Sequence, residues 1–320
     1  MSNLEQAPAE LFCQDRPGTG VTVLTARDVP LGGPRAIRVR RTLPQRERSL
    51  IGAWCFADHY GPASTAMDVA PHPHTGLQTA SWLFSGEVEH RDSLGTHAMV
   101  RPGELNLMTS GHGIAHSEVS TPETTVLHGV QLWIALPDEH RHTARDFHHY
   151  APPRITLPGV SARVFLGSFL GETSPVPAFT PLLGAELVLE PGSRLVPAVD
   201  REFEHGILQD TGSLTVAGTA LTTGDMAYVA PGADRLELAN TGAEPARVLL
   251  LGGTPFPEEI VMWWNFVGRS HDEIAEFRAA WQAEDGQFGR VEGYPGNRLP
   301  APELPRTRLA PRRNHPEGQR

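Results

Sequence analysis

The chain has 320 residues, a formal net charge of −10 at pH 7 and two cysteines, Cys13 and Cys55. The acidic balance argues against binding along the phosphate backbone of nucleic acids. No apolar run reaches the ~18 residues that a membrane-spanning helix needs, so we expect no membrane contact. Two cysteines make no disulfide framework, and the N-terminus lacks the basic start and apolar run of a secretory signal. These features lead us to expect a cytoplasmic protein.

Short β-favouring runs dominate the chain from about residue 20. The 32 glycines and 29 prolines are typical of many short strands joined by tight turns. In the first half the pattern predicts strands at Gly20–Thr25, Ala36–Arg40, Thr79–Phe84, His97–Val100, Leu105–Met108 and Val126–Leu136. Turn residues recur every ~8–12 positions between them, a spacing that indicates an all-β sandwich or barrel.

A second series of strands begins near residue 150. We predict strands at Ala162–Phe165, Ala185–Leu189, Gly206–Leu208, Leu214–Val216, Met226–Val229, Leu236–Leu238 and Arg247–Leu251. The turns Thr211-Gly212 and Thr223-Gly224 in this half correspond to Ser85-Gly86 and Pro102-Gly103 in the first half. This weak internal repeat is compatible with two similar β-units in tandem.

One helix is predicted near the C-terminus. Ser270 and Glu273 have the spacing of a capping box, and Ile274, Phe277 and Trp281 then form one apolar stripe. Gly286 is a plausible end of this helix. Residues 299–320 are rich in proline and arginine and poor in apolar residues, so we expect a disordered tail there.

Histidines are crowded in the first half, where 12 of the 15 lie between His59 and His149. Side chains two residues apart on a strand point to the same face. His72 and His74 therefore share one face, and His116 and Glu118 share another. Two such pairs on neighbouring strands would form a pocket of three imidazoles and one carboxylate, which suits Fe, Mn, Co, Ni, Cu or Zn.

The same residues carry a family resemblance. The segments Phe56–Pro62, His72–Gly76, Pro102–Glu104, Gly113–Glu118 and Gln131–Trp133 together resemble the pirin family, a bicupin group of the cupin superfamily. The resemblance implies two tandem jelly-roll-like cupin barrels. We expect a metal-binding cupin over residues 1–145, a second cupin over 146–268, a helix over 269–290 and the disordered tail over 299–320.

The resemblance also implies a cofactor and an activity. It places one divalent ion, Fe(II) or a substitute such as Ni, Co, Mn, Cu or Zn, on residues His72, His74, His116 and Glu118. Several pirins have quercetin 2,3-dioxygenase activity, which opens a flavonol with O₂ to give a depside and CO. In such an enzyme Glu118 would stay a ligand or act as the general base for the substrate hydroxyl. Leu, Phe and Met side chains of Thr79–Phe84 and Leu105–Met108 are candidates for the substrate lining.

Other pirins bind partner proteins without catalysis, so a second interpretation stays open. In it, the chain is a non-enzymatic regulator whose partner binding follows the redox state of the metal. We expect the enzyme, acting as a monomer on a small aromatic substrate and O₂.

The second half lacks a matching ligand set. The counterparts of His72, His74, His116 and Glu118 fall on Ala198, Asp200, Glu237 and Ala239. The one histidine nearby, His205, is expected to be a buried side chain with its hydrogen bonds satisfied. The C-terminal cupin is therefore predicted to carry no metal. His59 is left open as a residue near the N-terminal pocket or a structural one.

Overall fold

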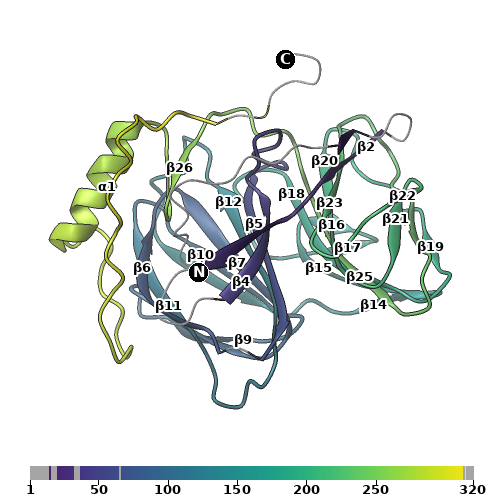
Figure 1. Cartoon of the computed structure of the whole chain (residues 1–320), viewed down its shortest axis with the longest axis horizontal. Helices are drawn as coiled ribbons and strands as arrows, with labels where there is room; N and C mark the ends of the chain where they lie inside the picture. The colour runs from purple at the N-terminus through teal and green to yellow at the C-terminus, as the bar shows by residue number, and fades with distance from the viewer. Residues whose placement is uncertain (1–13, 16–19, 32–36, 65, 313, 315–320) are drawn as a thin grey trace.

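β-Strands are the dominant secondary structure of the computed structural model, which describes residues 14–15, 20–31, 37–64, 66–312 and 314. Figure 1 shows two β-barrels side by side, with helix α1 on the outer side of the barrel that contains β6 and β11. The predicted all-β class, with two tandem barrels and one short C-terminal helix, is confirmed. In the described part of the chain, no helix is both long enough and apolar enough to cross a bilayer.

Two antiparallel sheets form the N-terminal barrel. The larger sheet has seven strands in the spatial order β13 (Asp146–Tyr150), β10 (Leu105–Thr109), β7 (Leu77–Ser85), β12 (Leu127–Ala135), β5 (Trp54–Ala63), β4 (Ile37–Leu43) and β3 (Arg27–Leu31). The smaller sheet has the order β6 (Asp68–His74), β11 (Ile114–Ser120), β8 (Val88–Asp92) and β9 (His97–Val100). β6 is thus an edge strand, which explains how it accommodates Pro71 and Pro73.

The C-terminal barrel repeats this plan. Its larger sheet has the order β1 (Gln14–Asp15), β2 (Val21–Leu24), β23 (Met226–Val229), β20 (Glu204–Thr211), β25 (Ala246–Gly253), β18 (Leu182–Leu189), β15 (Val160–Leu166) and β14 (Ile155–Leu157). Its smaller sheet has the order β19 (Arg194–Leu195), β24 (Leu238–Asn240), β21 (Leu214–Val216) and β22 (Thr219–Ala220). Two short hairpins complete the strands: β16 (Ser168–Phe169) with β17 (Glu172–Thr173), and β26 (Val261–Trp263) with β27 (Phe266–Gly268).

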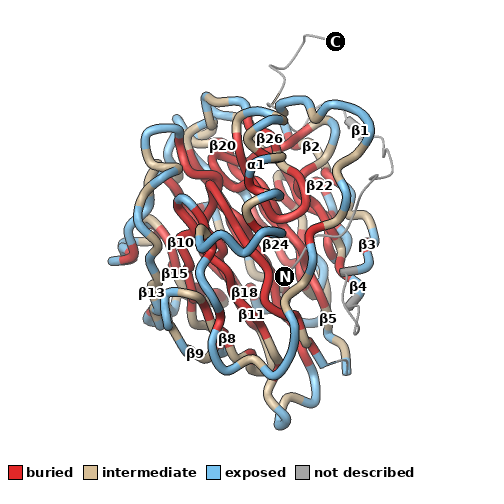
Figure 2. The backbone as a smooth tube through the Cα atoms, turned by 90° about the vertical axis from the view of Figure 1, so that its left-hand side faces the viewer, coloured by how far each residue is buried: buried red, intermediate tan, exposed pale blue. Residues whose placement is uncertain are grey.

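The two larger sheets pack face to face and bury one continuous core between the barrels. Figure 2 shows the buried strands in red and the exposed segments mostly at the periphery. Trp54 anchors it, because its Nε1 donates to the carbonyls of Leu183 and Gly252 in the other barrel, at 3.2 Å each. Leu105 and Leu107 belong to this interdomain core. Their predicted role in a substrate lining is therefore wrong, because that face of β10 is covered by the second barrel.

Chain segments cross between the barrels. Strand β2 pairs with β23 in the C-terminal sheet, although it precedes the whole N-terminal barrel in sequence. Conversely, β13 pairs with β10 in the N-terminal sheet. The hairpin β26–β27 also returns to the N-terminal barrel, where Val267 packs with Leu77 and Trp133. Each barrel therefore contains strands from outside the sequence range predicted for it.

Helix α1 spans His271–Ala283. The predicted cap is confirmed, since the side chain of Ser270 accepts from the backbone N–H of Glu273. Ile274, Phe277 and Trp281 form the buried face. The helix ends before Gly286, because Glu284 already adopts a left-handed conformation with φ of 53°.

The predicted disordered tail needs a correction over most of its length. Residues 299–312 and 314 lie on the protein: the N–H of Leu299 donates to Pro71 O on edge strand β6 at 2.8 Å, and Ala301 is buried. Asn314 Oδ1 accepts from the backbone N–H groups of Ser49 and Leu50. The few apolar residues of this segment are enough to pack against α1, and β6 offers an unpaired edge. Residues 313 and 315–320 lie outside the described residues.

Candidate metal centre

Antiparallel pairing of β6 with β11 brings three of the predicted ligands together. His116 lies opposite His72, and Ile114 lies opposite His74. All three histidines are fully buried, and one ring nitrogen of each lies within 4.8 Å of the others. The predicted convergence of His72, His74 and His116 on one point inside the first barrel is therefore present in the structure.

The outer nitrogens of two of these rings are held by backbone carbonyls. His72 Nδ1 donates to Ala70 O at 2.9 Å, and His74 Nδ1 donates to Asn265 O at 3.1 Å. A neutral imidazole carries one proton, so both Nε2 atoms present lone pairs toward the centre. His72 Nε2 is buried and has no hydrogen-bond partner among the described residues. A buried lone pair without a donor is what a metal ion would satisfy.

Burial keeps these rings neutral. It lowers the pKa of His72, His74 and His116 well below the ordinary histidine value, and the neighbouring imidazoles lower the pKa of His116 further. The neutral ring is the form that binds a metal. The residues present therefore fit a first-row divalent ion with nitrogen ligands.

Glu118 lies next to this group without being part of the tight cluster. It is buried on β11, and a register shift after His116 places it opposite Val69 of β6. Ser81 Oγ donates to its Oε1 at 3.3 Å. The three histidines alone have ligand atoms within 4.8 Å of one another. Glu118 as the fourth ligand remains our proposal.

A second buried group, His59, His128 and Asp210, lies between the barrels. The Nε2 atoms of both histidines lie 2.6 Å from Asp210 Oδ1, and Arg247 Nε donates to Asp210 Oδ2 at 2.6 Å. Arg40 donates to His59 Nδ1 at 3.2 Å, so the proton of His59 is on Nε2. This arrangement is a hydrogen-bonded junction that ties the barrels together. His59 therefore faces the second barrel.

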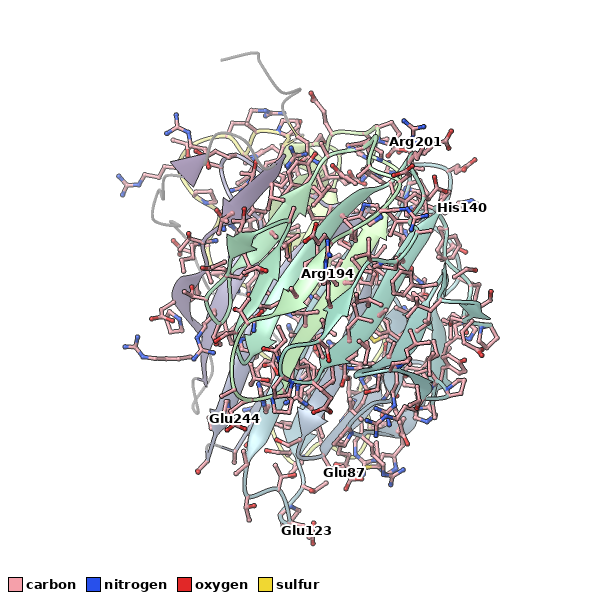
Figure 3. The ribbon with its side chains drawn as sticks, turned by 90° about the vertical axis from the view of Figure 1, so that its right-hand side faces the viewer. Glu87, Glu123, His140, Arg194, Arg201 and Glu244 are labelled. Carbon is pink, nitrogen blue, oxygen red and sulfur yellow. The ribbon has the colours of Figure 1, made fainter. Side chains whose placement is uncertain are left out.

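The counterparts in the C-terminal barrel are dispersed. Asp200 is exposed, and Glu237 pairs with Arg194 at 2.9 Å. Figure 3 shows Arg194 on the outer side of this barrel. His205 is buried, but neither of its nitrogens has a hydrogen-bond partner among the described residues, so the expectation that its hydrogen bonds are satisfied is wrong. Burial lowers the pKa of His205 to about 4, which keeps the ring uncharged against Gly252 and Leu183.

Comparison with known proteins places this geometry in a family. The pirin family model matches residues 36–134, and the model of the pirin C-terminal cupin domain matches residues 184–289. The chain belongs to the pirin family. A relative from Pseudomonas aeruginosa, named "putative quercetin 2,3-dioxygenase", is 45% identical over 314 residues, covering 95% of this chain and 98% of the relative. A pirin-like protein of Caulobacter vibrioides is 36% identical over 88% of this chain and 99% of its own length.

A solved structure has the same architecture. The quercetin 2,3-dioxygenase of Acinetobacter baumannii superposes with a TM-score of 0.84 at 40% sequence identity, covering 90% of this chain and 96% of that one. The bicupin fold of this chain is thus shared with a protein described as a dioxygenase.

Sequence reasoning missed the residues behind the ligands. Asn265 orients His74 from a hairpin 191 residues away, which no local pattern could indicate. His90 and Asp92 alternate on β8 and face His116 and Glu118 in register. The His-x-Asp spacing was the available signal for this pair, by the parity that predicted His72 and His74.

Proposed function

We propose that this pirin is a metal-dependent dioxygenase of the quercetin 2,3-dioxygenase type, which cleaves a flavonol or a similar aromatic enol with O₂. The observation that carries the proposal is the convergence of three neutral imidazoles beside the buried carboxylate of Glu118. The 45% identical relative and the 40% identical structure, both named for this reaction, support it.

A divalent ion, Fe(II) in our proposal, would be held by His72, His74, His116 and Glu118. When bound, it would supply Lewis acidity toward the substrate hydroxyl together with coordination positions left open by a four-ligand set. Backbone carbonyls hold His72 and His74 in one tautomer, so that their Nε2 atoms need no proton rearrangement to bind the ion. The buried setting excludes bulk water from the reacting atoms.

Glu118 is the candidate general base. A carboxylate two residues from His116 on the same face lies where a substrate hydroxyl beside the ion would lose its proton. Ser81 Oγ lies between Glu118 Oε1, at 3.3 Å, and Gln131 Oε1, at 3.0 Å. Ser81 therefore helps to fix the position of the carboxylate beside the three imidazoles.

Anaerobic loading followed by oxygen tests the proposal. Apo-protein is loaded with Fe(II), Ni(II), Co(II) or Mn(II), mixed with quercetin and then exposed to O₂, while the flavonol absorbance and the release of CO are followed. We expect turnover that the His116→Ala variant lacks. The matched control is His112→Ala, since His112 is exposed and four residues away. Absence of turnover with every metal would refute the enzyme and leave the regulatory role.

The same proposal includes the oligomeric state, the cellular compartment and the substrates of the enzyme. We propose a monomer that acts in the cytoplasm on a small aromatic substrate and O₂. Light scattering after gel filtration of the loaded protein gives the molar mass. A value near 35 kDa, close to the 34.8 kDa of the chain, is expected, and twice that value would contradict the monomer.

A further inference from the structure

The third histidine ligand has a different outer partner from the other two. His72 and His74 donate to backbone carbonyls, but His116 Nδ1 lies 3.3 Å from His90 Nδ1. A carbonyl can only accept, whereas an imidazole nitrogen can donate or accept. The tautomer of His116 is thus not fixed by its immediate neighbour alone. It depends on which nitrogen of His90 carries the proton.

Asp92 determines that choice. Its Oδ2 lies 3.3 Å from His90 Nε2, and its Oδ1 accepts from the backbone N–H groups of Leu94 and Thr96 at 2.9 Å each. Two backbone N–H donors on Oδ1 favour the ionised form of the carboxylate. An ionised carboxylate has no proton to give, so His90 must supply one from Nε2.

The packing around His90 leaves it little freedom to rearrange. His90 and Asp92 are 3% and 2% exposed. The His90 ring lies against Phe147, with centroids 4.9 Å apart and planes at 35°. Strand pairing sets Asp92 opposite His116 and His90 opposite Glu118, so all four side chains face the barrel interior. A His90 ring with its proton on Nδ1 would turn the Nε2 lone pair against the carboxylate.

We propose that His90 and Asp92 are positioning residues of the metal centre, in which Asp92 fixes the proton of His90 on Nε2. His90 Nδ1 then accepts from His116 Nδ1–H, and the Nε2 lone pair of His116 is left for the ion. A carboxylate behind a ligand imidazole in this way also raises the basicity of the ligand. The inference rests on the proposed metal centre and is independent of whether the chain cleaves flavonols.

The tautomers are read directly by NMR. Full-length protein labelled with ¹⁵N-histidine and loaded with Zn(II), a diamagnetic probe, gives two-bond ¹H–¹⁵N patterns for each ring. We expect His90 protonated on Nε2 and His116 protonated on Nδ1. A His90 ring with its proton on Nδ1 in the wild-type protein would overturn the proposal.

Asp92→Asn tests the role of the carboxylate. Its Oδ1 still accepts from Leu94 and Thr96, but an amide N–H now faces His90 Nε2 and drives the His90 proton to Nδ1. We expect Zn(II) to bind about 10–100-fold more weakly by chelator competition. Glu89→Gln on the same strand is the matched control, because Glu89 pairs with Arg91 and His97 on the outer side. It is expected to change the Kd less than about twofold. Equal Kd values for Asp92→Asn and wild type would contradict the proposal.

A pair of His90 variants gives a second, independent test, which also applies if Asp92→Asn fails to fold. His90→Asn keeps an acceptor oxygen where His90 Nδ1 lies, and His90→Leu removes it. We expect His90→Asn to bind Zn(II) within about threefold of wild type and His90→Leu to bind about 10–100-fold more weakly. Equal loss in both variants would show that His90 acts only through packing. Quercetin turnover does not enter any of these readouts.

Discussion

The Nε2 atoms of His74 and His116 lie 3.1 Å apart, although the two residues are separated by 42 positions in the chain. His74 Nδ1 donates its proton to Asn265 O, and His116 Nδ1 meets His90 Nδ1. With both protons on the outer nitrogens, two lone pairs face each other inside a buried barrel. A cation between them removes this repulsion, which is why we place the ion there.

Metal binding should stabilise the fold. An ion that binds the folded state alone adds about 2.7 kcal/mol at a free concentration of 100 times its Kd. We expect urea unfolding of the wild-type protein to show this gain with Fe(II) under anaerobic conditions or with Ni(II). The His72→Ala variant should gain nothing. An equal gain in this variant would place the stabilising ion elsewhere.

The Glu118→Gln variant distinguishes the two roles proposed for Glu118, metal ligand and general base. The amide keeps an acceptor for Ser81 but cannot take a proton and is a poorer ligand. We expect kcat for flavonol cleavage to fall at least about 100-fold. Metal content per chain, measured by plasma mass spectrometry, should fall as well if Glu118 is a ligand. Full metal content with lost turnover would assign Glu118 to the base role alone, and unchanged turnover would exclude it from both.

Gly76→Ala should loosen the segment that orients His74. Gly76 has φ of +65°, and an added Cβ would lie 2.4 Å from Val267 O in the hairpin that also carries Asn265. We expect a loss of about 2–4 kcal/mol of unfolding free energy, with weaker metal binding. Gly192→Ala is the matched control, because φ is +72° and nothing lies within 4 Å of the added atom. That substitution should cost about 1 kcal/mol. Equal losses would show that the contact with Val267 is unimportant.

His205 should make the free energy of unfolding depend on pH, with stability lost as the pH falls. Its pKa is lowered from 6.5 to about 4 in the folded protein, so the unfolded chain binds the proton more readily. The uncharged ring is compatible with full stability above pH 6.5, and stability is lost as the pH falls toward 4. The loss should reach about 2–3 kcal/mol. Urea unfolding of His205→Leu from pH 7 to 4 should lack this loss relative to wild type. Parallel pH curves for the two proteins would refute it.

Strand parity predicted the shared face of the first two histidine ligands, and the capping pattern predicted the start of helix α1. His72 and His74 share a face because they alternate on one strand, and α1 begins at Ser270 because of a local side-chain cap. Strand β5 was missed, since its polar residue Asp58 is buried only through pairing with Arg41 at 2.7 Å. That pairing depends on a neighbouring strand, so the local sequence does not show that Asp58 is buried.

The features that the sequence did not predict depend on contacts between residues far apart in the chain. The exchange of β2 into the second barrel, the docking of Leu299 on β6 and the contact of Asn265 with His74 join residues far apart in the chain. Propensity and periodicity describe windows of a few residues, so they carry no information about such partners. The ligands were predictable because they lie within strands. The groups that fix their tautomers were not, because they come from other strands and from the C-terminal hairpin.

Anomalous diffraction at the iron edge from crystals of the Fe-loaded protein tests the central claim most directly. The account predicts one strong anomalous peak per chain, at an iron ion bound by the Nε2 atoms of His72, His74 and His116. The account would be contradicted by a peak at the junction of His59, His128 and Asp210 instead. It would also be contradicted if the protein bound one iron per chain in solution but the crystals showed no peak at the three histidines.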